Sequence, residues 1–219
     1  MNAFVLAGGQ STRMGRDKAL LEVGGRPLVE RTVEMLRGLG LSPRICGSRP
    51  DLARFAEVVA DNFAQCGPLG GIEAALAVSG SELNLFVPVD LPGLPRGFLQ
   101  WMMGRAETSQ AVAMIPRYGG RVQPLCAVYS RRVGDGLRRR LASGDYKVMA
   151  AVREVAASLG EAVDEFDVES VASTGPSEWP LRPPLAEWFS NMNTPADYER
   201  LSSTGWSKRA SSNKLRTGS

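Results

Sequence analysis

Two kinds of apolar segment alternate along most of this chain. Short, nearly continuous apolar runs such as residues 2–6 and 84–90 are typical of strands buried on both faces. Longer segments such as residues 27–38 repeat apolar residues every three or four positions between a proline and a glycine, which is typical of an amphipathic helix. The same patterns predict further strands at residues 44–46, 57–60, 110–115, 123–129, 162–166 and 187–189, and further helices at residues 70–78, 95–105, 131–142, 148–157 and 195–201.

This alternation of strands and helices predicts an α/β protein. Strands separated by helices of this length form β-α-β units with right-handed crossovers, so we expect a Rossmann-like, mostly parallel sheet flanked by helices. Residues 1–201 are expected to form one domain. In such sheets ligands bind outside the carboxyl ends of the strands, where the loop after Leu6, Asp61 and Asp90 would meet.

Composition restricts the chemistry that such a domain could perform. The 219 residues include no histidine, which excludes a Ser-His-Asp triad, a histidine general base and a histidine-bound metal. The three cysteines, Cys46, Cys66 and Cys126, are far apart and without a CxxC pair, so we expect reduced thiols and a cytoplasmic protein. No apolar run approaches the roughly 20 residues that span a bilayer, and no basic segment precedes the first strand, so neither a membrane partner nor a signal peptide is expected.

The net charge of +3 comes from the end of the chain. Residues 202–219 hold four of the 26 basic residues and none of the acidic ones, which leaves 22 basic against 23 acidic residues before them. The rest of the chain is therefore nearly neutral, and a nucleic-acid partner is not expected. Rich in serine, glycine and basic residues, the segment 202–219 is predicted to be a disordered tail.

The segment LAGGQSTRMGRDKALL, residues 6–21, follows the first strand directly. Gly8 and Gly9 would let the backbone approach a ligand and point N–H groups at an anion. Arg13 and Lys18 add a planar guanidinium and a compact ammonium group, both suited to phosphate oxygens. The spacing matches neither a Walker A loop nor GxGxxG, so the residues alone allow either a phosphate-binding loop or a glycine-rich turn with solvated cations.

Four ordered segments resemble one enzyme family. LAGGQSTRMGRDK resembles the LAGGxSxRMGxDK loop of the nucleotidyltransferases that activate metabolites with nucleoside triphosphates, in particular the molybdenum cofactor guanylyltransferases. GPLGGI, VPVDLPGLP and NMNTPAD follow at residues 67–72, 87–95 and 191–197 in the same order as in that family. The resemblance implies a nucleotide-diphospho-sugar transferase fold and transfer of GMP from GTP to molybdopterin-bound molybdenum, with release of pyrophosphate.

The resemblance also implies roles for residues that would bind the nucleotide. Leu6, Ala7, Gly8 and Gly9 would cradle the guanine and ribose, and Asp61 would contact the nucleotide. Arg13 and Lys18 would hold the triphosphate, and Asp90 would bind Mg²⁺. Taken alone, Asp90 could equally be a turn or capping residue before Pro92, and Asp61 an ordinary aspartate at a strand end.

The second substrate would be a molybdopterin-type cofactor, and the resemblance places Asn191 and Asn193 against the pterin. Gly70 lies in GPLGGI, where exposed helix N–H groups would suit an anion, although a plain helix start explains the segment as well. Lys147 would contact the cofactor phosphate. The implied partners of the product are cofactor-insertion proteins and apo-molybdoenzymes.

One segment departs from the family pattern. Where relatives can present an asparagine to the nucleotide after the second strand, this chain reads Cys46-Gly47-Ser48. Either backbone groups replace that amide or the glycine loop determines base selection. Two alternatives to guanylyl transfer therefore stay open: cytidylyl transfer to the same cofactor, whose enzymes tend to carry LAAG rather than LAGG, and a non-catalytic nucleotide or cofactor carrier.

Overall fold

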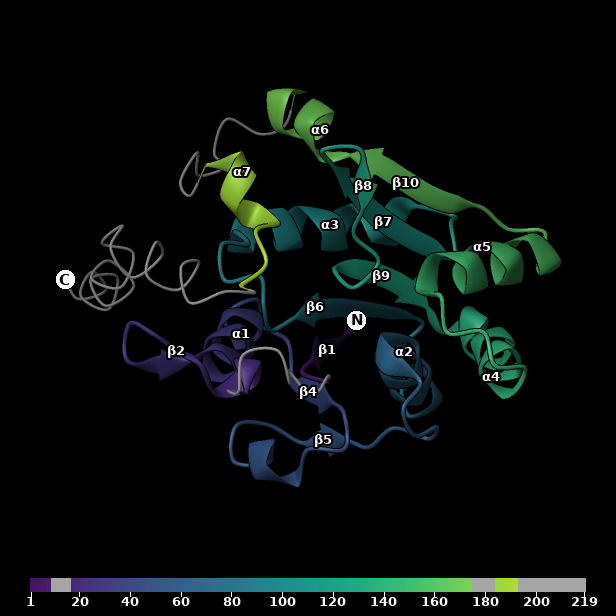
Figure 1. Cartoon of the computed structure of the whole chain (residues 1–219). Coiled ribbons are helices and arrows are strands. Elements are labelled where there is room, and N and C mark those ends of the chain that lie inside the picture. Colours follow the sequence, from purple (N-terminus) through teal and green to yellow (C-terminus); the bar gives the residue numbers. More distant parts are fainter. Residues whose placement is uncertain (9–16, 175–183, 193–219) are drawn as a thin grey trace.

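The computed structural model describes residues 1–8, 17–174 and 184–192, and these form a sheet with helices on both faces (Figure 1). The strands are β1 (Asn2–Leu6), β2 (Glu22–Val23), β3 (Arg26–Pro27), β4 (Pro43–Cys46), β5 (Val58–Val59), β6 (Leu83–Pro88), β7 (Ala113–Tyr118), β8 (Arg121–Val122), β9 (Ala127–Ser130) and β10 (Val163–Asp167). The α-helices are α1 (Leu28–Arg37), α2 (Gly67–Ala77), α3 (Arg96–Thr108), α4 (Gly134–Ala142), α5 (Val148–Ser158), α6 (Val168–Thr174) and α7 (Leu185–Trp188).

The main sheet has the order β10-β7-β9-β6-β1-β4-β5, with β8 paired to β7. Strand β1 lies near its centre and is parallel to both neighbours, β4 and β6. The pairs β4–β5 and β7–β10 are also parallel. The prediction of a mostly parallel α/β sheet is therefore confirmed.

Alternate side chains of β1 point to opposite faces of the sheet and pack into two separate cores. Ala3 and Val5 belong to a buried cluster that includes the apolar faces of α1 and α3. Phe4 and Leu6 point to the opposite face, into a second cluster with residues of α2, α4 and α5. Because both faces of β1 are covered, its sequence is continuously apolar from Ala3 to Leu6 rather than alternating.

One strand of the main sheet is antiparallel to both of its neighbours. The segment predicted as a strand at residues 123–129 ends as β9, which is antiparallel to both of its neighbours, β6 and β7. No helix separates it from the strand before it, and a parallel crossover needs a dozen or more residues. Its pairing with β6 stops at Phe86, so Pro88 lies beyond the last pair and its missing N–H is not needed on that side.

Other element predictions differ in detail. The strand predicted at residues 187–189 is wrong: this region contains α7, and Trp188 and Phe189 pack against Phe98 with ring centroids 5.3 and 5.9 Å apart. Helix α2 begins at Gly67, one turn before the predicted start. The helix predicted at 195–201 and the tail at 202–219 lie outside the described residues. None of the described helices is long and apolar enough to cross a membrane.

Candidate active site

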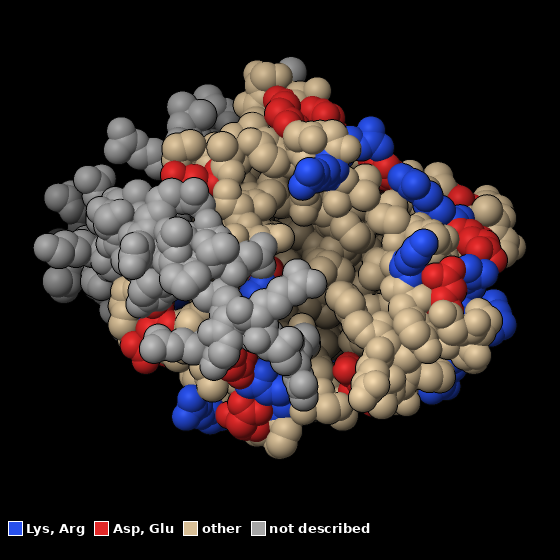
Figure 2. All heavy atoms as spheres, viewed as in Figure 1, with Lys and Arg blue, Asp and Glu red and all other residues tan. Residues whose placement is uncertain are grey.

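The carboxyl end of β1 lies between the ends of two parallel neighbours. Leu6 is in register with Cys46 on one side and with Pro88 on the other. The Ala7 N–H donates to the Cys46 carbonyl at 3.3 Å, and the Leu6 carbonyl accepts from the Val89 N–H at 3.2 Å. Gly8 follows as an exposed residue. Viewed as in Figure 1, the molecule is hollowed near its centre, between α7 and β8 above and α2 below (Figure 2).

Lys18 and Asp90 meet at this edge although they lie far apart in the sequence. Lys18 opens a short 3-10 turn, Lys18–Leu20, and Asp90 lies two residues beyond the end of β6. The Lys18 Nζ is 3.6 Å from Oδ2 of Asp90, and the two side chains are 24% and 23% exposed. Both groups are thus partly shielded from water while retaining access to a ligand.

The electrostatic environment of Asp90 reflects two opposing effects. Burial raises the pKa of this carboxyl group above its ordinary value, and the Lys18 ammonium partly offsets that rise. Within the described ranges, no three acidic or cysteine side chains gather closely enough to enclose a metal ion. A single carboxylate still fits Mg²⁺, which is often held by one or two carboxylates together with substrate phosphates.

Asp61 lies beyond the end of β5, on the other side of β1. Its Oδ1 atom is buried and has no hydrogen-bond partner among the described residues. Burial raises the pKa of Asp61. A Cβ atom added to Gly71 in α2 would lie 3.6 Å from this oxygen and also 3.6 Å from Leu6 Cδ2, so Asp61 faces the space between α2 and the end of β1. An unpaired carboxylate oxygen in this position is an acceptor for a ligand donor.

The predicted pterin residue Asn191 lies beside Asp90. Its neighbour Met192 is buried, and the Met192 N–H donates to the Asp90 carbonyl at 3.0 Å. Asn191 itself is exposed. The backbone bond therefore brings a segment from the end of the described chain to the carboxyl end of β6.

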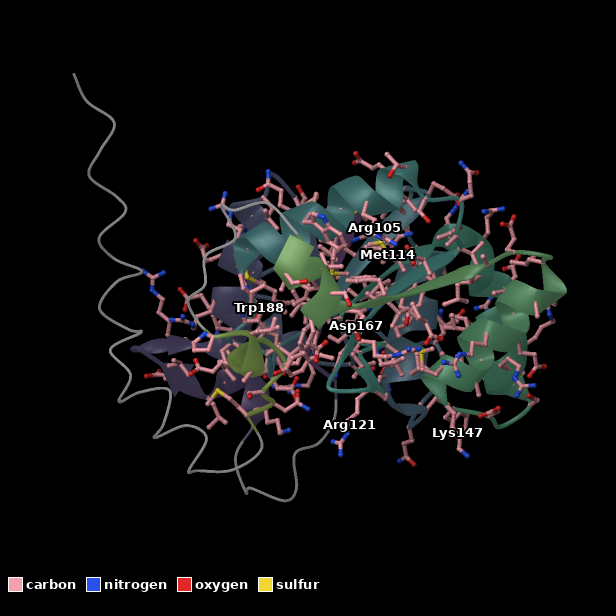
Figure 3. The ribbon with its side chains drawn as sticks, turned by 90° about the horizontal axis from the view of Figure 1, so that it is seen from above. Arg105, Met114, Arg121, Lys147, Asp167 and Trp188 are labelled. Carbon is pink, nitrogen blue, oxygen red and sulfur yellow. The ribbon has the colours of Figure 1, made fainter. Side chains whose placement is uncertain are left out.

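Gly70 and Lys147 form a separate group at α2. Gly70 is buried in the first turns of that helix, where an added Cβ would lie 3.3 Å from the Phe63 carbonyl. Lys147 is exposed and precedes α5, and the Cys66 side chain, in the residue before α2, raises the pKa of the neighbouring Tyr146. In Figure 3, Lys147 lies toward the opposite end of the molecule from Trp188. The predicted pterin residues thus divide between two places.

The segment Cys46-Gly47-Ser48, which replaces the family asparagine, uses most of its backbone groups in hydrogen bonds within the fold. The Cys46 carbonyl accepts from Ala7, the Gly47 N–H donates to Val59 at 3.0 Å, and the Gly47 carbonyl accepts from Arg49 at 2.8 Å. Cys46 is buried, as are the other two cysteines, and all three are free thiols as expected. Of these three residues, Cys46 and Gly47 are buried and Ser48 is exposed.

Three of the predicted site residues, Gly9, Arg13 and Asn193, lie outside the described residues. The structure also brings in two charged residues that the sequence interpretation missed, Asp17 and Arg49, whose side chains form an ion pair next to Lys18. Asp17 precedes a helical turn, as capping aspartates do, and this could have indicated its role. Arg49 gave no such signal because its partner is 32 positions away.

Comparison with known proteins agrees with this geometry. Residues 3–169 match the MobA-like NTP transferase domain. The chain is 33% identical over 174 residues to the probable molybdenum cofactor guanylyltransferase of Pyrococcus horikoshii, covering 76% of this chain and 88% of that protein. It is 38% identical over 168 residues to the molybdenum cofactor guanylyltransferase of Cereibacter sphaeroides, covering 72% and 83%.

A solved structure supports the same fold. The crystal structure of molybdopterin-guanine dinucleotide biosynthesis protein A from Archaeoglobus fulgidus superimposes with a TM-score of 0.74 at 24% identity, covering 92% of this chain and 97% of that one. The family match covers more than half of the chain, and it includes Leu6, Lys18, Asp61 and Asp90. The chain therefore belongs to the family of MobA-like NTP transferases.

Proposed function

We propose that this protein transfers GMP from GTP to the terminal phosphate of a molybdopterin-bound molybdenum cofactor. The observation that carries the proposal is the pairing of Lys18 with Asp90, 3.6 Å apart at the carboxyl end of β6 and next to the glycine-bearing end of β1. The relatives named as molybdenum cofactor guanylyltransferases support the choice of base and acceptor.

The reaction suits a site without histidine. An oxygen of the cofactor's terminal phosphate attacks the α-phosphorus of GTP, and the bond to the bridging α,β-oxygen breaks as pyrophosphate leaves. The second pKa of a phosphate monoester is about 6, so the nucleophile is mostly a dianion at neutral pH and needs no general base. The protein must instead bring two polyanions together and stabilise charge on the leaving group, which are tasks for cations and positioning.

The nucleotide half of the site lies around the end of β1. Leu6, Ala7 and Gly8, with the predicted Gly9, offer backbone groups to the guanine and ribose. The unpaired Oδ1 of Asp61 supplies an acceptor for a nucleotide N–H or hydroxyl donor. Lys18, together with the predicted Arg13, binds the triphosphate, with Lys18 at the α-phosphate.

Asp90 is the residue that would hold Mg²⁺. Its carboxylate provides the hard oxygen that this ion prefers, and the Lys18 ammonium opposes the rise in the pKa of Asp90 that burial causes. Mg²⁺ bound there would supply charge neutralisation at the triphosphate oxygens.

The cofactor half of the site has two parts in this proposal. Asn191 and the predicted Asn193 contact the pterin beside Asp90, while Lys147 and the N–H groups near Gly70 face anionic groups of the cofactor. The product would then pass to cofactor-insertion proteins and apo-molybdoenzymes in the cytoplasm.

Turnover with GTP and CTP, measured side by side with molybdopterin and Mg²⁺, tests the proposal. We expect pyrophosphate release with GTP at a rate at least about 10-fold above that with CTP, because one unmatched buried polar contact to a base costs about 1–3 kcal/mol. Preference for CTP would identify a cytidylyltransferase. Binding of GTP without any pyrophosphate release would identify a carrier.

Asn191→Ala is expected to separate the two substrates. Asn191 is exposed and precedes Met192, whose N–H donates to the Asp90 carbonyl, so we expect KM for the molybdopterin substrate to rise about 5- to 30-fold through loss of a hydrogen bond of about 1–2 kcal/mol. GTP affinity should change less than about 2-fold, measured by titration of the variant without cofactor. A weakened GTP complex would place Asn191 in the nucleotide half instead.

A further inference from the structure

The turn that follows β4 contacts the chain on both sides of the glycine-rich loop. Gly47 has a φ of +127°, and a Cβ added there would lie 3.4 Å from the Gly8 Cα, so its backbone packs directly against Gly8. Two residues later, the Arg49 guanidinium contacts the Asp17 carboxylate. Gly8 and Asp17 are the described residues that flank positions 9–16. One turn, residues 47–49, thus holds the start and the end of that loop.

The Arg49 side chain is fixed by two carboxylates. Its Nε donates to Asp51 Oδ1 at 2.9 Å and its Nη2 donates to Asp51 Oδ2 at 2.6 Å, an arrangement that fits the planar fork of arginine. The same Nη2 donates to Asp17 Oδ2. These bonds lower the pKa of Asp51 and raise that of Arg49. The two bonds to Asp51 therefore fix the orientation of the guanidinium that contacts Asp17.

Asp17 connects Arg49 to the turn that contains Lys18. While its Oδ2 binds Arg49, its Oδ1 accepts the Ala19 N–H at 3.0 Å, and its carbonyl accepts the Leu20 N–H at 3.2 Å. Asp17 is therefore the cap of the Lys18–Leu20 turn. Ala19 is buried, so the turn is anchored on its inner side as well.

We propose that Arg49 is a positioning residue for Lys18. It acts through Asp17: the ion pair fixes the capping carboxylate, the cap fixes the 3-10 turn, and the turn directs the Lys18 ammonium toward Asp90. The connection joins the carboxyl end of β4 to that of β6 across β1. This inference rests on the proposed role of Lys18 at the triphosphate, where a displacement of about 1 Å can cost about 100-fold in rate.

The competing interpretation is an ordinary ion pair that contributes only to folding. Arg49 and Asp17 are 24% and 32% exposed, and a partly shielded ion pair of this kind can stabilise a fold without any role in catalysis. The chain offers a matched control in Arg105, which binds Asp164 through Nε at 2.9 Å and Nη2 at 3.1 Å and joins α3 to β10 (Figure 3). Arg105→Gln removes a similar bidentate pair outside the proposed site.

The kinetic test compares Arg49→Gln with Arg105→Gln. We expect Arg49→Gln to lower kcat/KM for GTP at least about 10-fold, and Arg105→Gln to change it less than about 2-fold, with similar small losses of thermal stability. Arg49→Lys, which keeps the charge but loses the fork, should fall between Arg49→Gln and the unmodified protein. In a Lys18→Ala background, Arg49→Gln should have less than about 2-fold further effect. An equal loss of activity in both backgrounds would contradict the proposal.

Amide hydrogen exchange tests the same connection without using the reaction. The amides of Ala19, Leu20 and Leu21 are bonded to acceptors of Asp17 and Lys18. Their exchange should accelerate in Arg49→Gln and stay unchanged in Arg105→Gln, and unchanged exchange in both would overturn the role of Arg49. If the unmodified protein releases no pyrophosphate from GTP, the proposed function fails, and the exchange measurement still decides whether Arg49 holds the Lys18 turn.

Discussion

Replacing Lys18 with alanine is expected to lower guanylyl transfer from GTP by at least about 100-fold, because the variant loses the cation that we propose faces the triphosphate as negative charge develops. The Nζ atom lies 3.6 Å from the Asp90 carboxylate in a partly buried site, where a charge is screened less than at the open surface. We expect GTP affinity to fall less than turnover, since the contact strengthens in the transition state. Steady-state kcat and KM, together with GTP titration, measure the two effects.

The same substitution should also move the pH dependence of the residual activity. Burial raises the pKa of Asp90, and the Lys18 ammonium opposes that rise. Without Lys18 the pKa of Asp90 rises further, so a larger fraction of the carboxyl group is protonated at a given acidic pH. The acidic limb of the rate profile, recorded from about pH 5 to about pH 8, should therefore shift toward higher pH.

Lys147 provides the control for the loss of a lysine. It is exposed and directly precedes α5, and the proposal assigns it to the cofactor half of the site, so Lys147→Ala should leave GTP binding unchanged and affect only the molybdopterin substrate. Near-normal turnover in Lys18→Ala, or equal effects of the two variants on GTP, would remove Lys18 from the reaction.

The sequence pattern predicted the part of the fold that carries the site, and the reason is burial. Strands β1 and β6 are covered on both faces, so their apolar runs are unambiguous, and Asp90 lies two residues beyond the end of β6. Parallel pairing then brings the end of β6 next to the end of β1. The positions of Leu6 and Asp90 could therefore be predicted from the local apolar pattern together with the rule that ligands bind at the carboxyl ends of parallel strands.

Elements that depend on distant packing were harder to predict. The three residues Glu187, Trp188 and Phe189 contain adjacent aromatics that suit a strand, but their rings pack around Phe98 of α3 and the chain turns there as α7. The hairpin of β2 and β3 has two residues in each strand, too few for a periodic signal, and depends on Gly24 and Gly25 with positive φ.

The Arg49–Asp17 pair shows why the support of a site is less predictable than the site itself. Lys18 and Asp90 lie in segments that the family resemblance and the strand pattern both indicated. Arg49 lies after a short strand in a turn whose conformation depends on Gly47. A charged residue in such a turn has many possible partners, and only the three-dimensional arrangement selects Asp17.

Asp90→Asn is expected to abolish nearly all transfer, by at least about 100-fold, while leaving the fold intact. Asparagine keeps the size and one oxygen but removes the charge that attracts a divalent cation, and a metal ion contributes several kcal/mol to charge stabilisation in such reactions. We expect binding of GTP in the absence of Mg²⁺ to change little. Because the lesion lies in metal affinity, excess Mg²⁺ should restore part of the activity.

Thermal unfolding distinguishes this role from a structural one. The folded-state pKa of Asp90 is raised by burial, so its contribution favours folding below the unfolded pKa and is lost as pH rises through the raised folded-state pKa. An asparagine side chain at this position carries no such charge, so the Asp90→Asn variant should be at least as stable as the unmodified protein at about pH 7, and its advantage should shrink toward about pH 4.

A capping aspartate would give the reverse result. Its loss would cost about 0.5–2 kcal/mol of stability and little chemistry. The following helix, α3, has Pro95 at its N-cap and no side-chain capping bond, so the fold does not use Asp90 in that way. Turnover across a Mg²⁺ titration, recorded beside the melting temperature, therefore separates the two roles. A lower melting temperature with unchanged turnover would assign Asp90 a structural role. A stable protein whose turnover is lost, and is partly restored by excess Mg²⁺, would assign Asp90 to metal binding.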